Sequence, residues 1–386
     1  MRKSQKKLLV STAVPSAAYV APPVSKVSAA NSPDLAVRIH EAALVCGYEN
    51  CGIIRVAEMS EYEAAIASRI GRFPESRPMY TRFAHYAEPK NEHPWAGSIV
   101  VCTRWYGKYV IPEHLEGIIA KYFLVDTRLD ARSKAYQDSI RFEDSLRGMG
   151  LRVEGKKDFG ITAMRWAAMR AGIGIIRQNN FLYTEKGSWH ELEAFFIDRD
   201  LELKHSQALK ACPKKCDLCR RACPTGALAE PFQTNGMACM TYLTCFAVCG
   251  PNKKHYDKTG SWIFGCDACQ DACPFNKEAW KATEKYPGLN ELGAYLFYEQ
   301  ILDMSYPELR ALLSMKFWYI KEEDAWKWKC NVLNAMRNTY VAHYLPHIDK
   351  ARQDDNENVR AMAEWVFGSV TEPRPTSERE KGKDAL

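Results

Sequence analysis

Cys212-Pro-Lys-Lys-Cys216-Asp-Leu-Cys219-Arg-Arg-Ala-Cys223-Pro224 is the most informative part of this chain, and a shorter version follows at Cys266-Asp-Ala-Cys269-Gln-Asp-Ala-Cys273-Pro274. Both runs end in three residues followed by Cys-Pro. In two-cluster ferredoxins, closely spaced thiolates hold one 4Fe-4S cube, and the cysteine before the proline binds the other cube. The repeated pattern therefore predicts two adjacent 4Fe-4S clusters.

Each cluster needs four thiolates, and the second run offers only two close cysteines besides its Cys-Pro cysteine. One more ligand must come from between the runs, and we expect Cys239, in Cys239-Met-Thr-Tyr-Leu-Thr, to supply it. The expected ligands are Cys212, Cys216, Cys219 and Cys273 for cluster one, and Cys223, Cys239, Cys266 and Cys269 for cluster two. Cys245 and Cys249 are left over, and we expect them to be ordinary buried thiols.

Short cysteine spacings also occur in four-cysteine zinc sites, which are the competing interpretation. The doubled Cys-Pro ending favours iron-sulfur clusters, because cross-ligation of two cubes uses it and an isolated zinc knuckle does not. Ten of the 14 cysteines lie within 62 consecutive residues, which is unlike a disulfide scaffold. Such clusters favour a reducing compartment, so we expect a cytoplasmic protein.

The composition is that of a globular chain. Its 386 residues predict two to three domains, and 46% hydrophobic residues are enough to fill their cores. The apolar stretches are interrupted before the roughly 18 residues that a membrane span requires, so we expect no membrane partner. We also expect the protein to be a monomer. The net charge of +6, from 53 Lys+Arg against 47 Asp+Glu, permits an acidic partner without requiring one.

Hydrophobic periodicity predicts an α+β protein. Helical spacing occurs at residues 34–46 and 133–149, and strand-like runs occur at 51–56, 99–102 and 195–197. From residue 287 onward the pattern is helical, and a pair of helices joined near Pro346 resembles a HEAT-like repeat hairpin that covers the preceding domain. The expected parts are a disordered leader (1–33), an α/β cofactor-binding core (34–202), a ferredoxin-like double-cluster domain (203–286), a helical segment (287–370) and a disordered tail (371–386).

A further stretch, Ala171-Gly-Ile-Gly174-Ile-Ile-Arg-Gln-Asn179-Asn-Phe-Leu182, is followed by Gly187-Ser-Trp189 and Ile197-Asp198. Together with the cysteine runs, these residues resemble the epoxyqueuosine reductases over roughly residues 35–370. That family shares a corrinoid and two-cluster architecture with the reductive dehalogenases. The resemblance implies a cobalamin over a nitroreductase-like core, fed with electrons by the nearer cluster. It places Gly172, Gly174, Arg177, Asn179, Gly187 and Ser188 at the cofactor.

The chain departs from this family at two places. Arg177 stands where the family usually has glycine, which is expected to place a guanidinium near the corrin or substrate pocket. The Arg-Asp-Tyr-His stretch, whose aspartate the resemblance implies to be the proton donor, has no full counterpart. Asp130 lies at about that position, and it is either the proton donor or the cap of a helix that begins at Ala131. Asp126 and Tyr136 are further candidates.

Basic side chains flank the first cysteine run, and we call them the basic patch: Lys204, Lys210, Lys214, Lys215, Arg220 and Arg221. Such a patch is usually solvated surface, but it can also dock an acidic ferredoxin or flavodoxin as electron donor, or contact tRNA phosphates. Basic residues in 321–370 are offset by acidic ones, so we expect tRNA binding to be weak or confined to the basic patch. The predicted function is a cobalamin-dependent iron-sulfur reductase. Its rivals are a dehalogenase-like reductase of small molecules and a non-catalytic electron carrier.

Overall fold

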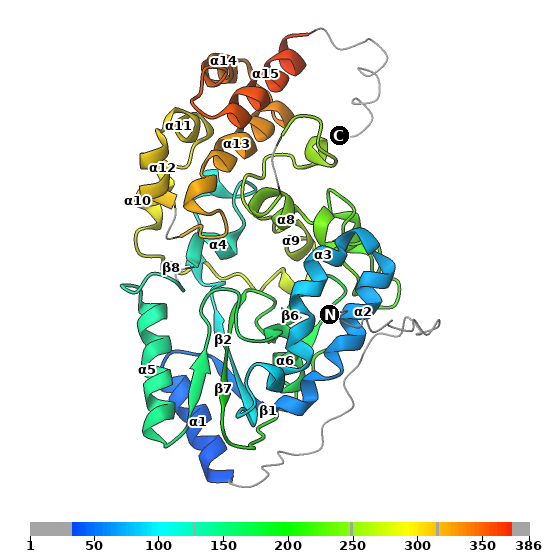
Figure 1. The fold of residues 1–386 in the computed structure, drawn as a ribbon, viewed down its shortest axis with the longest axis vertical. Helices are drawn as coiled ribbons and strands as arrows, with labels where there is room; N and C mark the ends of the chain where they lie inside the picture. The colour runs from blue at the N-terminus through cyan, green and yellow to red at the C-terminus, as the bar shows by residue number, and fades with distance from the viewer. Residues whose placement is uncertain (1–32, 127, 248–249, 314–315, 373–386) are drawn as a thin grey trace, which may run out of the picture.

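The computed structural model describes residues 33–126, 128–247, 250–313 and 316–372 (Figure 1). An α/β core occupies one end of the molecule, helices occupy the other end, and the cysteine-containing loops lie between them. The expected leader lies outside the described residues except for Pro33. The expected tail does so from residue 373 onward, whereas Thr371 still belongs to the last helix.

The core is built on a four-stranded antiparallel sheet with strand order β1-β2-β7-β4. Its strands are β1 (Asn50–Arg55), β2 (Ser98–Trp105), β7 (His190–Ile197) and β4 (Val153–Gly155). The three predicted strands are confirmed, with β2 and β7 longer than expected. The edge strand β4 was not predicted, because three partly exposed residues carry no periodic pattern.

Helices cover both faces of this sheet. Alternate residues of β2 divide between the two faces, with Val100 packed beside α1 (Pro33–Val45) and α5 (Lys134–Gly148) and Val101 packed beside α6 (Met164–Arg170). A strand covered on both faces needs apolar residues at every position, which explains the uninterrupted run at 99–102. The predicted helices at 34–46 and 133–149 are confirmed as α1 and α5.

The cysteine runs form short helices joined by loops. Helix α7 (Leu218–Arg221) lies in the first run, α9 (Ala268–Asp271) lies in the second, and α8 (Met240–Cys245) lies between them. The chain before the cysteine runs also forms α2 (Tyr62–Arg72), α3 (Arg77–Tyr80), α4 (Lys121–Val125), β3 (Tyr109–Val110), β5 (Ile175–Ile176) and β6 (Leu182–Tyr183). Strand β3 pairs in parallel with β8 (Glu284–Lys285), so the chain returns to the core after the second run.

The C-terminal part is helical, as predicted. Its helices are α10 (Leu289–Gly293), α11 (Tyr298–Asp303), α12 (Tyr306–Leu313), α13 (Trp326–Asn338), α14 (Leu345–Ala351) and α15 (Glu357–Thr371). Apolar side chains of α13 and α15 are buried. None of the helices in the described ranges is long and apolar enough to cross a membrane.

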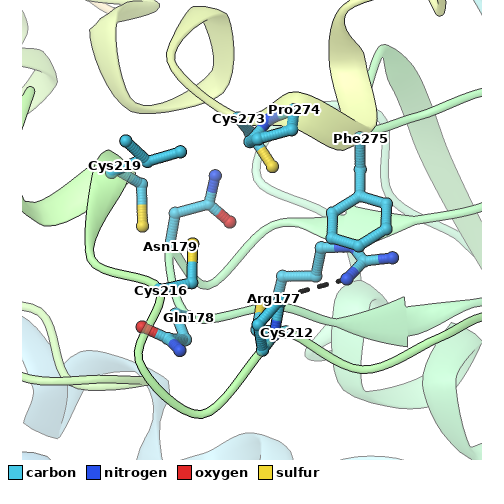
Figure 2. A pocket seen from close by; sticks show the side chains of 11 residues that line it. Arg177, Gln178, Asn179, Cys212, Cys216, Cys219, Cys273, Pro274 and Phe275 are labelled. Carbon is cyan, nitrogen blue, oxygen red and sulfur yellow. Dashed lines mark hydrogen bonds between the residues drawn. The ribbon is translucent and has the colours of Figure 1, made fainter.

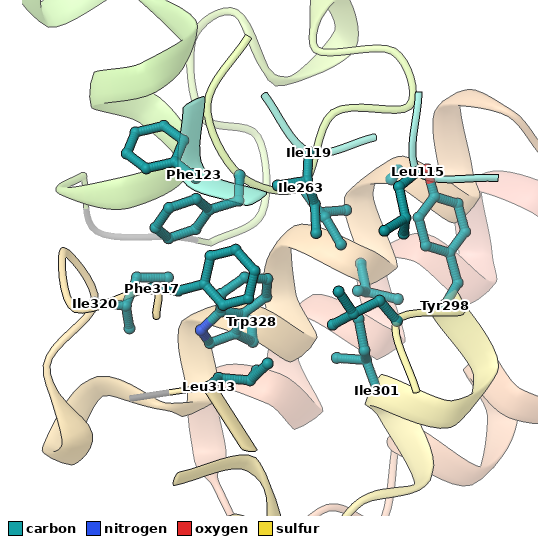
Figure 3. Packing of buried hydrophobic residues seen from close by; sticks show 14 of the residues in the cluster. Leu115, Ile119, Phe123, Ile263, Tyr298, Ile301, Leu313, Phe317, Ile320 and Trp328 are labelled. Atoms are coloured by element: carbon teal, nitrogen blue, oxygen red, sulfur yellow. The ribbon is translucent and has the colours of Figure 1, made fainter. Parts of the chain in front are cut away.

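These helices share one hydrophobic core with the cysteine-containing loops (Figure 3). Trp328 of α13 stacks on Phe264, two residues before Cys266, with ring centroids 4.9 Å apart. The Asn331 amide donates hydrogen bonds to the carbonyl oxygens of Thr244 (2.7 Å) and Ile263 (3.0 Å). Because both contacts hold the backbone next to cysteines, the helical part fixes the position of the second run.

Candidate metal centre

Four cysteines from the two runs line one cavity of about 120 Å³ (Figure 2). They are Cys212, Cys216, Cys219 and Cys273, which we call cysteine group one. The walls are completed by Pro213, Leu218, Pro274 and Phe275 and by the turn that carries Arg177, Gln178 and Asn179. Cysteine sulfurs are the ligands of iron-sulfur clusters, so this cavity has the ligand chemistry that a cluster requires.

The other four cysteines, Cys223, Cys239, Cys266 and Cys269, form cysteine group two. Burial raises the pKa values of Cys266 and Cys269, and the nearby Cys239 and Cys223 raise them further. Cys219 of group one also contributes to the raised pKa of Cys269, so the two groups are neighbours. The structure thus brings together the same two sets of four that the spacing predicts.

Burial favours the neutral thiol at Cys219 as well as at Cys266 and Cys269. Burial raises the pKa of Cys219 to about 11, reinforced by its neighbours in group one. A metal ion reverses this preference, because it binds the thiolate and releases the proton. Among the described residues, no three His, Cys, Asp or Glu side chains converge closely enough to hold a single metal ion.

Local backbone geometry directs the second run toward the first. Gly265, immediately before Cys266, has φ +72°. An added Cβ would lie 2.5 Å from the ring of Phe123, so only glycine fits there. The backbone N–H of Ala268 points at the Cys266 sulfur at 3.4 Å, which is the kind of contact that stabilises a thiolate.

The six residues assigned to the cofactor by resemblance lie at the junction between the core and the cysteine runs. The space beside each of the three glycines is filled by protein. A Cβ would lie 2.0 Å from the carbonyl oxygen of His205 at Gly172, 2.3 Å from that of Tyr183 at Gly174, and 2.5 Å from the Cβ of Ala279 at Gly187. These glycines therefore permit close packing of chain on chain.

Two of the other three residues belong to a buried hydrogen-bond network. The Asn179 amide donates to the Tyr183 hydroxyl (2.9 Å) and to the carbonyl oxygen of Cys269 (3.1 Å). The Ser188 hydroxyl donates to Gln270 (2.8 Å) and accepts from Asn276 (2.8 Å). The network ties the 171–182 stretch to the second cysteine run, which accounts for its polar residues without a corrin.

Arg177, the third of these residues, lies in the wall of the group one cavity. It is only 3% exposed, and its Nη1 lies 3.9 Å from the Cys212 sulfur. The guanidinium carbon stands 3.4 Å from the centre of the Phe275 ring. The resemblance led us to expect this guanidinium near a corrin or substrate pocket, and the structure places it beside group one.

The cavity contains polar atoms that have no protein partner. Among the described residues, Arg177 Nε and Gln178 Oε1 are buried without a hydrogen bond. Buried unpaired polar atoms are costly, and a cluster with its thiolates would provide acceptors for the arginine. The residues present therefore fit an iron-sulfur cluster. Neither Gln178 nor Phe275 was identified from the sequence, although Phe275 directly follows the second Cys-Pro.

Asp130 is half-buried and paired with a neighbour. Its carboxylate accepts hydrogen bonds from Arg132 Nε (3.0 Å) and Nη2 (3.2 Å), and these bonds lower the pKa of Asp130. The expectation that Asp130 caps a helix beginning at Ala131 is wrong, because α5 begins at Lys134. Its cap is Ser133, whose hydroxyl accepts from the Tyr136 N–H. The last candidate, Tyr136, makes this backbone contact and has Lys157 Nζ 5.1 Å from its ring centre.

Asp126, the other candidate, is almost completely buried at the end of α4. Its Oδ1 accepts from Arg128 Nε (3.0 Å) and its Oδ2 accepts from Trp318 Nε1 (3.3 Å). Burial, reinforced by the nearby Glu191 carboxylate, raises the pKa of Asp126 to about 8. A carboxylic acid with this pKa holds its proton at neutral pH, whereas Asp130 is ionised.

Aromatic side chains from distant segments gather next to Asp126. Trp318 stacks on Tyr319 with ring centroids 4.1 Å apart, and Phe159 and Phe246 contact Tyr319 at 5.4 Å. Both phenylalanines are about 40% exposed. The aromatic group therefore joins a buried acid to an apolar surface that solvent or a ligand can reach.

The basic patch is partly neutralised. Lys204 pairs with Glu58 and Glu202, and Arg221 pairs with Asp217. Lys210, Lys214 and Lys215 are exposed, and Arg220 is half-buried. Of the two remaining cysteines, Cys245 is buried in the core shared with the C-terminal helices, and Cys249 lies outside the described residues.

Comparison with known proteins supports the cluster chemistry and the fold. Residues 211–276 match the family model of the 4Fe-4S double cluster binding domain. The chain is 28% identical over 266 residues to the epoxyqueuosine reductase of Bacillus subtilis, covering 64% of this chain and 65% of that protein. It is 29% identical over 230 residues to the epoxyqueuosine reductase of Staphylococcus aureus, covering 56% of this chain and 56% of that protein. The chain thus spans just under two thirds of the first relative and about half of the second.

A solved structure has the same fold over most of the chain. It is described as epoxyqueuosine reductase with an epoxyqueuosine-modified stem loop of tRNA-Tyr, and it aligns with a TM-score of 0.71 and 23% identity. The alignment covers 91% of this chain and 94% of that one. This chain is therefore an α+β protein that resembles the epoxyqueuosine reductases in sequence and in fold, and it contains a double 4Fe-4S cluster domain.

Proposed function

We propose that this protein is a two-cluster iron-sulfur reductase that acts, like the epoxyqueuosine reductases, on an electrophilic carbon-oxygen bond. The observation that carries this proposal is the cavity in which cysteines of both runs meet beside a buried arginine. The two Cys-Pro cysteines favour iron-sulfur clusters over zinc, because this ending serves cross-ligation of two cubes.

In this proposal, group one binds cluster one and group two binds cluster two. Cys219 and Cys269 lie in the facing short helices α7 and α9, and their electrostatic coupling supports a short separation between the clusters. Electrons enter one at a time from a ferredoxin or flavodoxin. The exposed lysines of the basic patch are the proposed docking site, because such donors are acidic.

The resemblance also implies a cobalamin, a nitroreductase-like core and HEAT-like C-terminal helices. The six residues carried over for the cobalamin do not fit that role, because protein atoms fill the space beside the glycines and the polar side chains are satisfied by their neighbours or face group one. We include cobalamin in the proposed function on the resemblance alone, and we assign no residue of this chain to it.

We propose Asp126 rather than Asp130 as the proton donor. Reductive removal of an epoxide oxygen as water consumes two electrons and two protons, so an acid near the substrate assists the step. Asp126 is protonated at neutral pH and lies beside partly exposed aromatic side chains, whereas Asp130 is ionised and held by Arg132. Glu191, Arg128 and Lys316 are the charged groups that face Asp126 and tune its acidity.

The first candidate substrate is an epoxide carried on a tRNA, because a solved protein with this fold is described with such a stem loop. The second is a small electrophile. It is favoured by the absence of the family's Arg-Asp-Tyr-His stretch and by the mixed charge of the C-terminal helices. Exposed aromatic side chains near Asp126 can stack on a nucleobase or on a small aromatic ring, so they are compatible with both.

Anaerobic purification with joint measurement of iron, acid-labile sulfide and corrin tests the proposal. We expect about eight iron and about eight sulfide per chain. Added cobalamin should bind with the spectrum of its base-off form, and the loaded protein should turn over an epoxyqueuosine stem loop or a small epoxide. Zinc without sulfide would end the cluster assignment. Intact clusters with no response to cobalamin would leave the electron-carrier function instead.

A further inference from the structure

We propose that Arg177 sets the reduction potential of the cluster assigned to cysteine group one, by holding a buried positive charge against one of its ligands. The inference rests on the proposed function and deepens it, because it concerns how readily that cluster accepts an electron. The resembled family usually has glycine at this position, so the effect would be a property of this chain.

A tight turn presents Arg177 to the cavity. The backbone N–H of Asn180 donates to the carbonyl oxygen of Arg177 (2.8 Å), and Asn180 adopts a left-handed conformation with φ 63°. The turn connects β5 to β6, so both of its ends are held by a strand pair. The position of the arginine is therefore fixed by backbone structure.

Aromatic packing holds the guanidinium in place. Its carbon lies 3.4 Å from the centre of the Phe275 ring and 5.0 Å from that of Tyr183. Figure 2 shows Phe275 over the guanidinium and the contact between Arg177 and Cys212. A cation packed on aromatic rings keeps its charge and loses much of its water. The Arg177 guanidinium therefore lies close to the Cys212 sulfur with little solvent between them.

No carboxylate in the described part of the chain pairs with the Arg177 guanidinium. Among the described residues, the hydrogen bond of the Arg177 side chain goes to the Cys212 sulfur, and its Nε is unpaired. Reduction of a cluster adds one negative charge to an assembly that is already anionic. A nearby cation and hydrogen-bond donor stabilise the reduced form more than the oxidised form, and weak screening strengthens the effect. Arg177 should therefore raise the potential.

The test is a potentiometric titration of the anaerobically purified full chain, followed by electron paramagnetic resonance. The signal of cluster one is identified as the one absent from Cys216→Ser. Arg177→Met keeps the bulk of the side chain and removes its charge. We expect it to lower the equilibrium constant for reduction of cluster one about tenfold or more, which is a shift of about 59 mV per tenfold for one electron. Arg177→Lys should retain most of the wild-type potential.

Arg221→Met is the matched control. This arginine lies in the first cysteine run, its side chain is 68% exposed, and it pairs with Asp217. Its removal changes the net charge by the same amount but should leave the potential of cluster one unmoved, since solvent screens it. An equal shift in Arg221→Met would show a general charge effect and overturn the proposal.

The remaining outcomes are also decisive. A full iron complement with an unmoved potential in Arg177→Met overturns the inference and leaves the clusters in place. If Arg177→Met loses cluster one, Arg177→Gly replaces it in the titration, because the resembled family carries glycine there. Loss of iron from both variants would assign Arg177 to cluster retention and overturn its role in setting the potential. Absence of iron and sulfide from the wild type would overturn the cluster assignment itself.

Discussion

The cysteine runs and the segment that carries Asp126 and Asp130 acquire their chemistry in opposite ways. In the runs, spacing along the chain already determines which thiols meet, because short helices and Cys-Pro turns leave little freedom between them. Around Asp126, the environment comes from Trp318, Lys316 and Glu191, which are distant in sequence. A local motif such as the cysteine runs can therefore be recognised in the sequence, whereas the acidity of a carboxyl such as that of Asp126 cannot.

The largest expected effect concerns cross-ligation between the runs. Cys223 lies in the first run, but its neighbours are Cys266 and Cys269. Cys223→Ser should therefore lower the amount of bound cluster two more than the amount of bound cluster one. Cys219→Ser, four residues earlier, should do the reverse. Iron content and the two paramagnetic signals measure this. Equal loss from both clusters in both variants would remove the distinction between the two groups.

The second prediction separates the two aspartates. Asp126→Asn should lower kcat by about 10²-fold to 10⁴-fold, since it removes a proton donor while preserving shape. Asp130→Asn should change kcat less than about twofold, because Asp130 is ionised and bound to Arg132. Single-turnover rates of the cobalamin-loaded protein provide the measurement. A larger loss for Asp130→Asn would restore the sequence-based assignment.

The pH dependence follows from the same carboxyl. Because Asp126 must be protonated to donate, activity should fall as the pH rises through about 8. A raised pKa in the folded state also means that the native protein binds this proton more tightly than the unfolded chain. This contribution to stability is complete below pH 4 or so, and it is lost as the pH rises through the folded pKa.

Asp126→Asn should therefore weaken the decline of stability between about pH 4 and pH 8, in addition to lowering activity. Denaturant titrations of the full chain at several pH values give the measurement. Asp130→Asn is the control. Because the pKa of Asp130 is lowered in the folded protein, its carboxylate contributes stability that is lost as the pH falls, which is the opposite direction to Asp126. An unchanged pH profile in Asp126→Asn would contradict the raised pKa.

The smallest expected effect is on the junction that joins the core to the second run. Asn276→Ala removes the amide that donates to Ser188, and it leaves a buried hydroxyl with one partner fewer. We expect a loss of about 1–3 kcal/mol in the free energy of unfolding, with both clusters retained. Ser60→Ala, at an exposed hydroxyl, is the control. Loss of iron in Asn276→Ala would mean that the network also holds the cluster.

Much of the fold was predictable because its determinants are local. The strands at 51–56, 99–102 and 195–197 and the helices α1 and α5 follow from runs of apolar residues with regular spacing. The short strands β4, β3 and β8 were missed, because their pairing depends on partners brought together by the rest of the fold. The contact between Phe264 and Trp328 was not predicted either, because these residues are far apart in the sequence.

Some features of the candidate site also follow from local sequence, whereas others depend on the tertiary structure. The two groups of four cysteines were predicted from the sequence, since the number and spacing of thiols leave few ways to complete two clusters. The tertiary structure alone decided that the glycines at 172, 174 and 187 contact protein, that Arg177 faces Cys212 and that burial raises the pKa of Asp126. The physical reason is that burial and the approach of charges depend on segments far away along the chain, which no local pattern records.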